Sequence, residues 1–239
     1  ARLEELDRVT IKRIKVGSPS FEEEFLEEIK TGKYNFIFIS QVFFNTGKHI
    51  PTETIKKFVD AKLKDSLFCL DGYHSFCALP VDISTIEDEI FYLAGGYKYA
   101  QAGEGMCFMT LPKNCGLRPV DTGWFASFET LEESSLEVAY ANDGWRFAGS
   151  TRDFTAHYRF NKVWKKFFSD GHSIASMSEY IKTLQTVFLD NNPLKDCFSN
   201  TDLHSQGRFL TLNTGSKDVS ERIYKALHKL NVLTDFRGS

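Results

Sequence analysis

The sequence predicts an α/β fold: a largely parallel sheet with flanking helices, followed by a partial, smaller α/β lobe at the C-terminal end. Continuous apolar runs recur at residues 35–40, 66–71, 89–94 and 105–111, and such runs are typical of strands buried between helices. Amphipathic segments of helical spacing accompany them. Because parallel strands need crossover connections, this alternation indicates right-handed β-α-β units.

Three patterns mark the N-terminal part of the chain. Residues 9–16 alternate between apolar and polar side chains, which predicts a strand at an exposed edge. The acidic segment 21–30 has apolar residues at helical spacing and predicts a helix, whereas the unbroken apolar run 35–40 predicts a strand covered on both faces. A second helix is expected over residues 51–64, with Pro51 near its start.

Near residue 149 the pattern changes from buried strands to longer helices. Ser150 is expected to cap a helix, with Asp153 three residues farther on, as in a capping box. Another helix is expected over residues 173–190.

The last part of the chain predicts a small α/β lobe. We expect a strand over residues 208–212, a helix over residues 216–230 and a strand that begins at Val232. The chain is therefore divided into a large domain over residues 1–170 and a partial small domain over residues 171–239.

Composition and charge exclude several classes of function. The 239 residues include 29 basic and 32 acidic side chains, a net charge of −3, which gives no electrostatic reason to expect nucleic acid or an acidic membrane as a partner. No apolar run approaches the ~20 residues that cross a bilayer, and the charged N-terminal residues do not resemble a signal peptide. We therefore expect a cytoplasmic protein.

The cysteines are odd in number and show no CxxC spacing; they lie at positions 69, 77, 107, 115 and 197. Cys69 and Cys107 fall inside strand-like runs, where buried free thiols are common. This pattern favours reduced thiols over disulfides or a zinc site, so no metal is expected.

One lysine and one aspartate suggest a cofactor. Lys98 follows the apolar run 90–94 in a loop of tyrosine and glycine, and Asp71 ends the run 66–71. Ligands of open parallel sheets bind at the carboxyl ends of strands, so both side chains are expected at the same rim. A lysine forms a Schiff base with a carbonyl cofactor, and a carboxylate keeps a pyridine nitrogen protonated. A single loop lysine is usually a solvated surface residue, but together the two residues predict a site for pyridoxal 5'-phosphate (PLP).

Two segments carry a resemblance to a known family. The Asp-x-x-His segment at 71–74 and the Tyr-Lys-Tyr segment at 97–99, with the glycine turn at 102–105, resemble the cofactor motifs of the class V aminotransferase superfamily (PLP fold type I). Within it, kynureninase-like members are the nearest likeness. The likeness covers most of residues 35 to 165, and further agreeing segments are 40–47, 123–125 and 149–151.

The resemblance implies a role for each residue of these segments. Lys98 would form the Schiff base and move a proton between the substrate Cα and the cofactor. Asp71 would pair with the pyridine nitrogen, His74 would lie beside the ring, and Tyr97 would donate to the phosphate.

The resemblance also implies a homodimer with the cofactor site at its interface. Ser150 or Thr151 would approach the phosphate of the neighbouring subunit's cofactor. Trp124 would lie near the same interface, and a place in the core is the alternative for this residue.

The sequence departs from the family pattern in three respects. Gly96 stands where relatives often have a serine phosphate ligand, and Gln41 stands where kynureninases usually have histidine. The chain is also expected to be truncated at both ends, so that the phosphate-binding loop precedes it and the arginine for the substrate carboxylate follows it. Arg237 lies just before that position and is not taken as a substitute.

The expected function is that of a PLP-dependent enzyme with a small-molecule amino-acid substrate, in the first place a class V aminotransferase. A kynureninase-like hydrolase is the alternative among enzymes, and a non-catalytic relative that has kept the fold is the alternative outside them. A cysteine desulfurase is disfavoured, because Cys197 has no flanking pattern of a nucleophilic loop cysteine.

Overall fold

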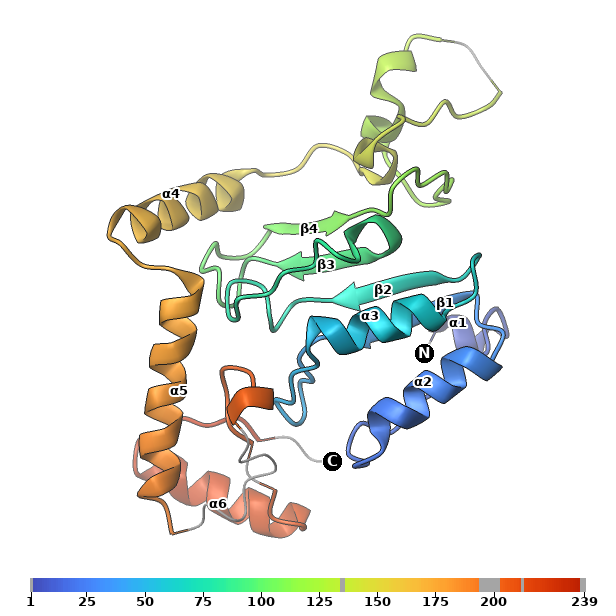
Figure 1. Ribbon diagram of the computed structural model, residues 1–239. Helices are drawn as coiled ribbons and strands as arrows, with labels where there is room; N and C mark the ends of the chain where they lie inside the picture. The colour runs from blue at the N-terminus through green and yellow to red at the C-terminus, as the bar shows by residue number, and fades with distance from the viewer. Residues whose placement is uncertain (1, 134–135, 194–202, 212, 237–239) are drawn as a thin grey trace.

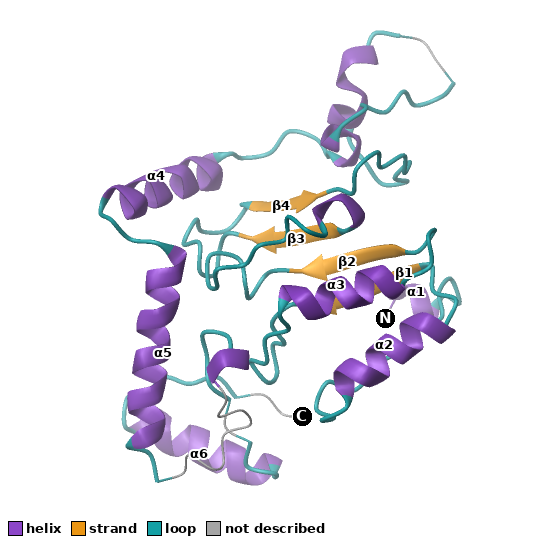
Figure 2. Ribbon diagram, in the orientation of Figure 1, coloured by secondary structure: helices purple, strands orange, loops and turns teal. Residues whose placement is uncertain are grey.

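The computed structural model describes residues 2–133, 136–193, 203–211 and 213–236. Its centre is a four-stranded sheet with the strand order β1-β2-β3-β4 (Figure 2). The strands are β1 (Phe36–Ser40), β2 (Leu67–Asp71), β3 (Phe91–Gly95) and β4 (Cys107–Thr110). The first three are parallel and β4 runs antiparallel to β3, so the largely parallel sheet expected from the apolar runs is confirmed.

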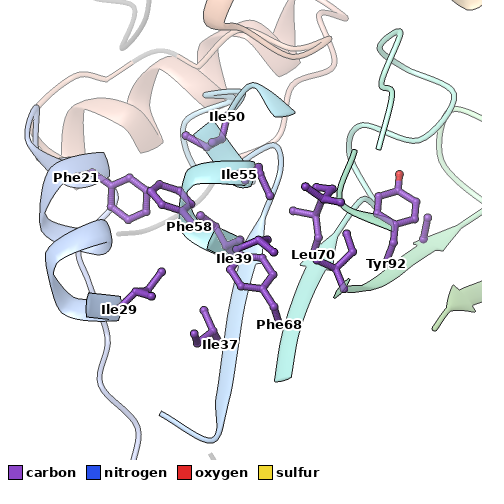
Figure 3. Packing of buried hydrophobic residues seen from close by; sticks show 14 residues of the cluster. Phe21, Ile29, Ile37, Ile39, Ile50, Ile55, Phe58, Phe68, Leu70 and Tyr92 are labelled. Atoms are coloured by element: carbon purple, nitrogen blue, oxygen red, sulfur yellow. The ribbon is translucent and has the colours of Figure 1, made fainter. Parts of the chain in front are cut away.

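Two amphipathic helices cover one face of this sheet. They are α2 (Phe21–Thr31) and α3 (Thr52–Ala61), and α3 lies across β1 and β2 with α2 beside it (Figure 1). Side chains of both helices pack between the alternate residues of β1 and β2 that point toward them (Figure 3). Fully or nearly fully buried members of this core include Phe21, Ile37, Ile55, Phe58, Phe68 and Leu70.

The other face of β1 is not covered in the described chain, which corrects the expectation of a strand buried on both sides. Phe36 and Phe38 are 55% and 51% exposed, whereas Ile37 and Ile39 between them are buried. Successive side chains of a strand point to opposite faces, and only one face of β1 meets α2 and α3. An unbroken apolar run therefore did not require two covering layers.

The expected edge strand over residues 9–16 is wrong. This segment follows the short helix α1 (Arg2–Glu5) and has no strand partner. Its apolar residues Ile14 and Val16 pack against the core cluster, and Arg13 forms an ion pair with Glu4 at 2.5 Å. The alternating pattern of residues 9–16 reflects apolar side chains that face the core. A strand also needs a neighbouring strand with free backbone N–H and C=O groups, and this segment has none.

The connection between β2 and β3 contains only the 3-10 helix η1 (Glu87–Glu89). After β4 the chain forms an arm, residues 112–153, with the 3-10 helices η2 (Trp124–Thr130) and η3 (Gly144–Phe147). The arm leaves from the end of the sheet opposite to the one toward which β2 and β3 point (Figure 1). Aromatic rings hold it together, among them Trp124 stacked on Phe125 with ring centroids 4.4 Å apart.

Long helices follow the arm. They are α4 (Thr155–Ser169), α5 (Ile174–Asp190) and, after the 3-10 helix η5 (Leu203–Ser205), α6 (Lys217–Lys229). The helix expected over residues 173–190 is confirmed as α5, and the Ser173 side chain at its start forms a capping box with Ser176. The cap at Ser150 is wrong: α4 begins at Thr155, where Asp153 accepts hydrogen bonds from the Thr155 backbone and hydroxyl.

The strands expected in the small lobe do not form in the described residues 203–211 and 213–236. Residues 205–209 pair instead with the loop after β1: Gly207 N donates to Gly47 O at 2.8 Å, and His49 N donates to Ser205 O at 2.8 Å. This part is therefore helical apart from its loops, which corrects the expected α/β lobe. The division at residue 170 stays a prediction.

Two sequence expectations about exposure have different outcomes. Cys69 is buried as expected, but Cys107 is exposed on β4, the last strand in the sheet order. No helix among the described residues is long and apolar enough to span a bilayer.

Candidate functional site

The carboxyl ends of the parallel strands bring Asp71 and its partners together. The register pairs Ser40 at the end of β1 with Asp71 at the end of β2, so both side chains lie on the same face. The Ser40 hydroxyl donates to Asp71 Oδ2 at 2.7 Å, and the Tyr73 backbone N–H donates to Asp71 Oδ1 at 2.9 Å. These donors fix the orientation of a carboxylate that is only partly buried.

Lys98 reaches the same rim from the loop after β3. Its Nζ lies 2.6 Å from Nε2 of His74, which belongs to the turn after β2. The rings of Phe44, Tyr73 and Tyr97 surround the amine, with centroids 5.9, 5.5 and 5.6 Å from Nζ. The amine is thus held among aromatic faces, which attract a cation and exclude part of the solvent.

The backbone of the Lys98 loop is tied down at several points. Gly96 N donates to Met106 O and Ala102 N donates to Gly96 O, both at 2.8 Å. From α4, the indole N–H of Trp164 donates to Ala100 O at 3.0 Å. The loop that presents the lysine is therefore a fixed part of the fold.

Gly96 is a glycine because its surroundings leave no room for a side chain. A Cβ at this position would lie 2.5 Å from Met106 Sδ and 2.9 Å from the Cβ of Ala102. The serine that relatives often carry there could not be accommodated without movement of Met106. Among the residues expected at the phosphate, Tyr97 is the one that stands at this rim, and it is 44% exposed.

Burial alters the acid–base behaviour of two tyrosines at this rim. It raises the pKa of Tyr73, with smaller contributions from Cys107, Tyr97 and Asp71. Burial also raises the pKa of Tyr99, against an opposing effect of the nearby Arg208 guanidinium. Both phenols therefore stay protonated at neutral pH and are hydrogen-bond donors.

Ser150 and Thr151 lie elsewhere. Both are exposed and belong to the arm, where the backbone around Ser150 packs against Gly123. A Cβ on Gly123 would lie 2.3 Å from the Gly149 carbonyl carbon, so this contact requires glycine. The structure thus brings Asp71, His74, Tyr97 and Lys98 together, whereas Ser150 and Thr151 belong to the arm. Trp124, 41% exposed, lies in the arm and not in the core.

Sequence reasoning missed several neighbours of the site. Phe44 and Phe209 contact the His74 ring, both with centroids 5.4 Å away, and Arg208 lies over the Tyr99 ring at 5.4 Å. Ser40 had a usable signal, since it ends a strand next to the one that ends in Asp71, and Phe44 lies in the segment 40–47 that carries part of the family resemblance. Nothing in the sequence indicates that residues 208 and 209, far along the chain, pack against the turn after β2.

These residues fit PLP. Lys98 supplies an amine for the cofactor aldehyde, and Asp71 supplies a carboxylate, anchored by Ser40, for the pyridine nitrogen. The aromatic rings around Lys98 provide flat apolar surfaces of the kind that a pyridine ring packs against.

Comparisons with known proteins agree with this fold. No family model and no curated protein matches the sequence. Solved structures do match: the apo structure of a cysteine desulfurase from Thermococcus onnurineus NA1 has a TM-score of 0.70 at 14% identity, over 94% of this chain and 56% of that one. A C-DES variant with glycine covalently linked to its PLP cofactor has a TM-score of 0.70 at 17% identity, over 90% of this chain and 56% of that one.

A third match, a NifS-like protein, has a TM-score of 0.65 at 11% identity and covers 99% of this chain and 59% of that one. The chain therefore spans less than two thirds of the length of these structures. At such identities the matches concern the fold alone. The chain therefore shares its α/β fold with a part of each of these three proteins.

Proposed function

We propose that this chain holds pyridoxal 5'-phosphate on Lys98 as part of an enzyme that acts on amino acids. The observation that carries the proposal is the placement of the Lys98 amine, the His74 imidazole and the anchored Asp71 carboxylate at one rim of the sheet. When bound, PLP supplies an electron sink for the substrate carbanion.

The residues of the chain have separate tasks in this proposal. Asp71 would face the pyridine nitrogen and keep it protonated, because opposite charge favours both ionised forms. His74 holds the Lys98 amine in place, and Lys98 would carry the proton to and from the substrate Cα. The Tyr97 hydroxyl would donate a hydrogen bond to the phosphate.

A class V aminotransferase is the activity that we propose first. A kynureninase-like hydrolase is the alternative, on the strength of the Asp-x-x-His and Tyr-Lys-Tyr segments. Product analysis separates the two: a keto acid with pyridoxamine phosphate for the first, and alanine released from kynurenine for the second. A cysteine desulfurase would require a nucleophilic cysteine, and Cys197 lies outside the described residues.

We also propose that the protein forms a homodimer in which Ser150 or Thr151 serves the neighbouring subunit's cofactor. Their position in the arm, away from Lys98 of the same chain, supports a role outside this subunit's own site. Sedimentation of the full-length protein with and without PLP tests this arrangement.

A spectrum tests the cofactor proposal directly. PLP bound covalently to Lys98 is expected to give an absorbance band at about 410–430 nm in the full-length protein. Lys98→Ala is expected to lose the band, and borohydride reduction should fix the label on the peptide that contains Lys98. Lys113→Ala, at an exposed lysine far from the rim, is the matched control and should keep the band.

The proposal fails if the wild-type protein stays colourless with added PLP. A band that persists in Lys98→Ala would place the cofactor on another amine. A protein that binds PLP at Lys98 but turns over no amino acid would be the non-catalytic relative.

A further inference from the structure

Gln41 makes two hydrogen bonds that hold the turn after β2 at both ends. Its backbone N–H donates to the carbonyl oxygen of Asp71 at 2.9 Å. Its side-chain Oε1 accepts from the Ser75 hydroxyl at 2.6 Å. Asp71 and Ser75 are the two ends of the turn, and His74 lies between them. We refer to this pair of bonds as the Gln41 bracket.

The bracket is buried beneath the rim. Gln41 and Ser75 are both 0% exposed, and Tyr92 of β3 is 6% exposed. The Tyr92 hydroxyl lies so close to Gly72 that a Cβ there would be 2.2 Å from it. The turn is therefore in close contact with buried side chains of Gln41, just after β1, and of Tyr92 in β3.

The side chain of Gln41 is not explained by stability alone. Its Nε2 is buried and has no hydrogen-bond partner among the described residues. A buried amide that leaves a donor unsatisfied costs folding free energy relative to an apolar side chain of the same size. The bond that it does make, to Ser75, is the one that fixes the turn.

We propose that Gln41 is a positioning residue that holds His74 against Lys98 through Ser75. Hydrogen bonds of this kind are strong where water is excluded, and they restrict the turn to one arrangement. The effect that we expect on PLP affinity rests on the proposed function, in which Lys98 and Asp71 hold the cofactor. The effect on Lys98 itself does not depend on that function.

Lys98 labelling in the absence of PLP tests the bracket. Acetic anhydride is applied to the full-length protein at several pH values, and acetylation of Lys98 is read by peptide mass spectrometry against the exposed Lys113. Gln41→Met keeps the side-chain length and removes the acceptor, and Ser75→Ala removes the donor. Both are expected to raise the Lys98 labelling rate several-fold and to displace its pH profile, because His74 is released.

Ser66→Ala is the matched control. Ser66 is another buried serine, at the opposite end of β2, and its hydroxyl donates to the Tyr34 carbonyl. This variant is expected to lower the melting temperature without a change in Lys98 labelling.

The double variant of Gln41 and Ser75 should show the same Lys98 labelling rate as either single variant, because the two changes remove the same bond. PLP affinity should fall about fivefold in each, as for one neutral hydrogen bond.

The proposal is overturned if Gln41→Met and Ser75→Ala lower the melting temperature but label at Lys98 like the wild type. If Gln41→Met does not fold, Ser75→Ala breaks the same bond with a smaller change. A wild-type protein that takes up no PLP would refute the proposed function. The labelling result would still show whether Gln41 positions His74 through Ser75.

Discussion

Nζ of Lys98 lies 2.6 Å from Nε2 of His74, although the two residues are 24 positions apart in the sequence. The contact joins the loop after β3 to the turn after β2, whose strands are parallel neighbours. Because the two groups are in contact, we expect a substitution of His74 to alter the properties of the Lys98 amine.

We predict that His74→Phe weakens PLP binding about tenfold or more. The substitution keeps a ring for the contacts with Phe44 and Phe209 but removes the hydrogen bond to Lys98, and a bond to a charged group contributes about 1.5–3 kcal/mol. Titration of the visible band with PLP measures the affinity. His172→Phe changes an exposed histidine between α4 and α5 and should leave the affinity unaltered. Equal affinities of His74→Phe and wild type would contradict the prediction.

Stability is expected to fall as the pH drops below about 6.5 because of His49. Burial lowers the pKa of His49, the charge of Lys182 lowers it further, and Glu53 opposes this. The neutral ring is thus the folded form. The unfolded chain begins to bind a proton as the pH falls below about 6.5, so folding free energy present at higher pH is lost below that value.

Urea unfolding at pH 7.5 and pH 5.5 measures this effect. His49→Gln should remove the loss between the two pH values, and Lys182→Met should reduce it, because one of the two causes of the lowered pKa is gone. Carboxylates with lowered pKa values, such as Glu28 and Asp82, titrate at lower pH and do not contribute here. An unchanged slope in His49→Gln would show that another group is responsible.

The thiols are expected to react in the order of their exposure. Burial raises the pKa of Cys69 to about 11 and that of Cys77 to about 12, so almost no thiolate forms at pH 8. Of the four cysteines in the described part of the chain, Cys107 is the exposed one and should be alkylated by iodoacetamide before the other three. Mass spectrometry of the peptides follows the reaction, and unfolding in urea should make Cys69 and Cys77 reactive. Rapid labelling of Cys77 in the folded protein would contradict its burial.

The N-terminal half of the fold was predictable because its strands and helices are marked by local patterns. The run 66–71 became β2 and the amphipathic segment 21–30 became α2. The same reasoning failed for residues 9–16 and 208–212. A strand depends on a partner as well as on its own pattern, and the sequence does not contain the position of the partner. The described residues of both segments are loops that pack apolar side chains without joining the sheet.

The nearness of Lys98 and Asp71 followed from the sequence, because parallel strands place their carboxyl ends at one rim. Their roles toward PLP stay a proposal. Only the tertiary structure decided which contacts hold the rim. Ser40 hydrogen-bonds Asp71, Gln41 hydrogen-bonds Ser75, and the Phe209 ring contacts the His74 ring. These contacts join segments that lie far apart in the chain, and they depend on strand register and on the docking of residues 205–209. Sequence pattern reports which side of an element is apolar, whereas register and docking arise from the packing of the whole chain.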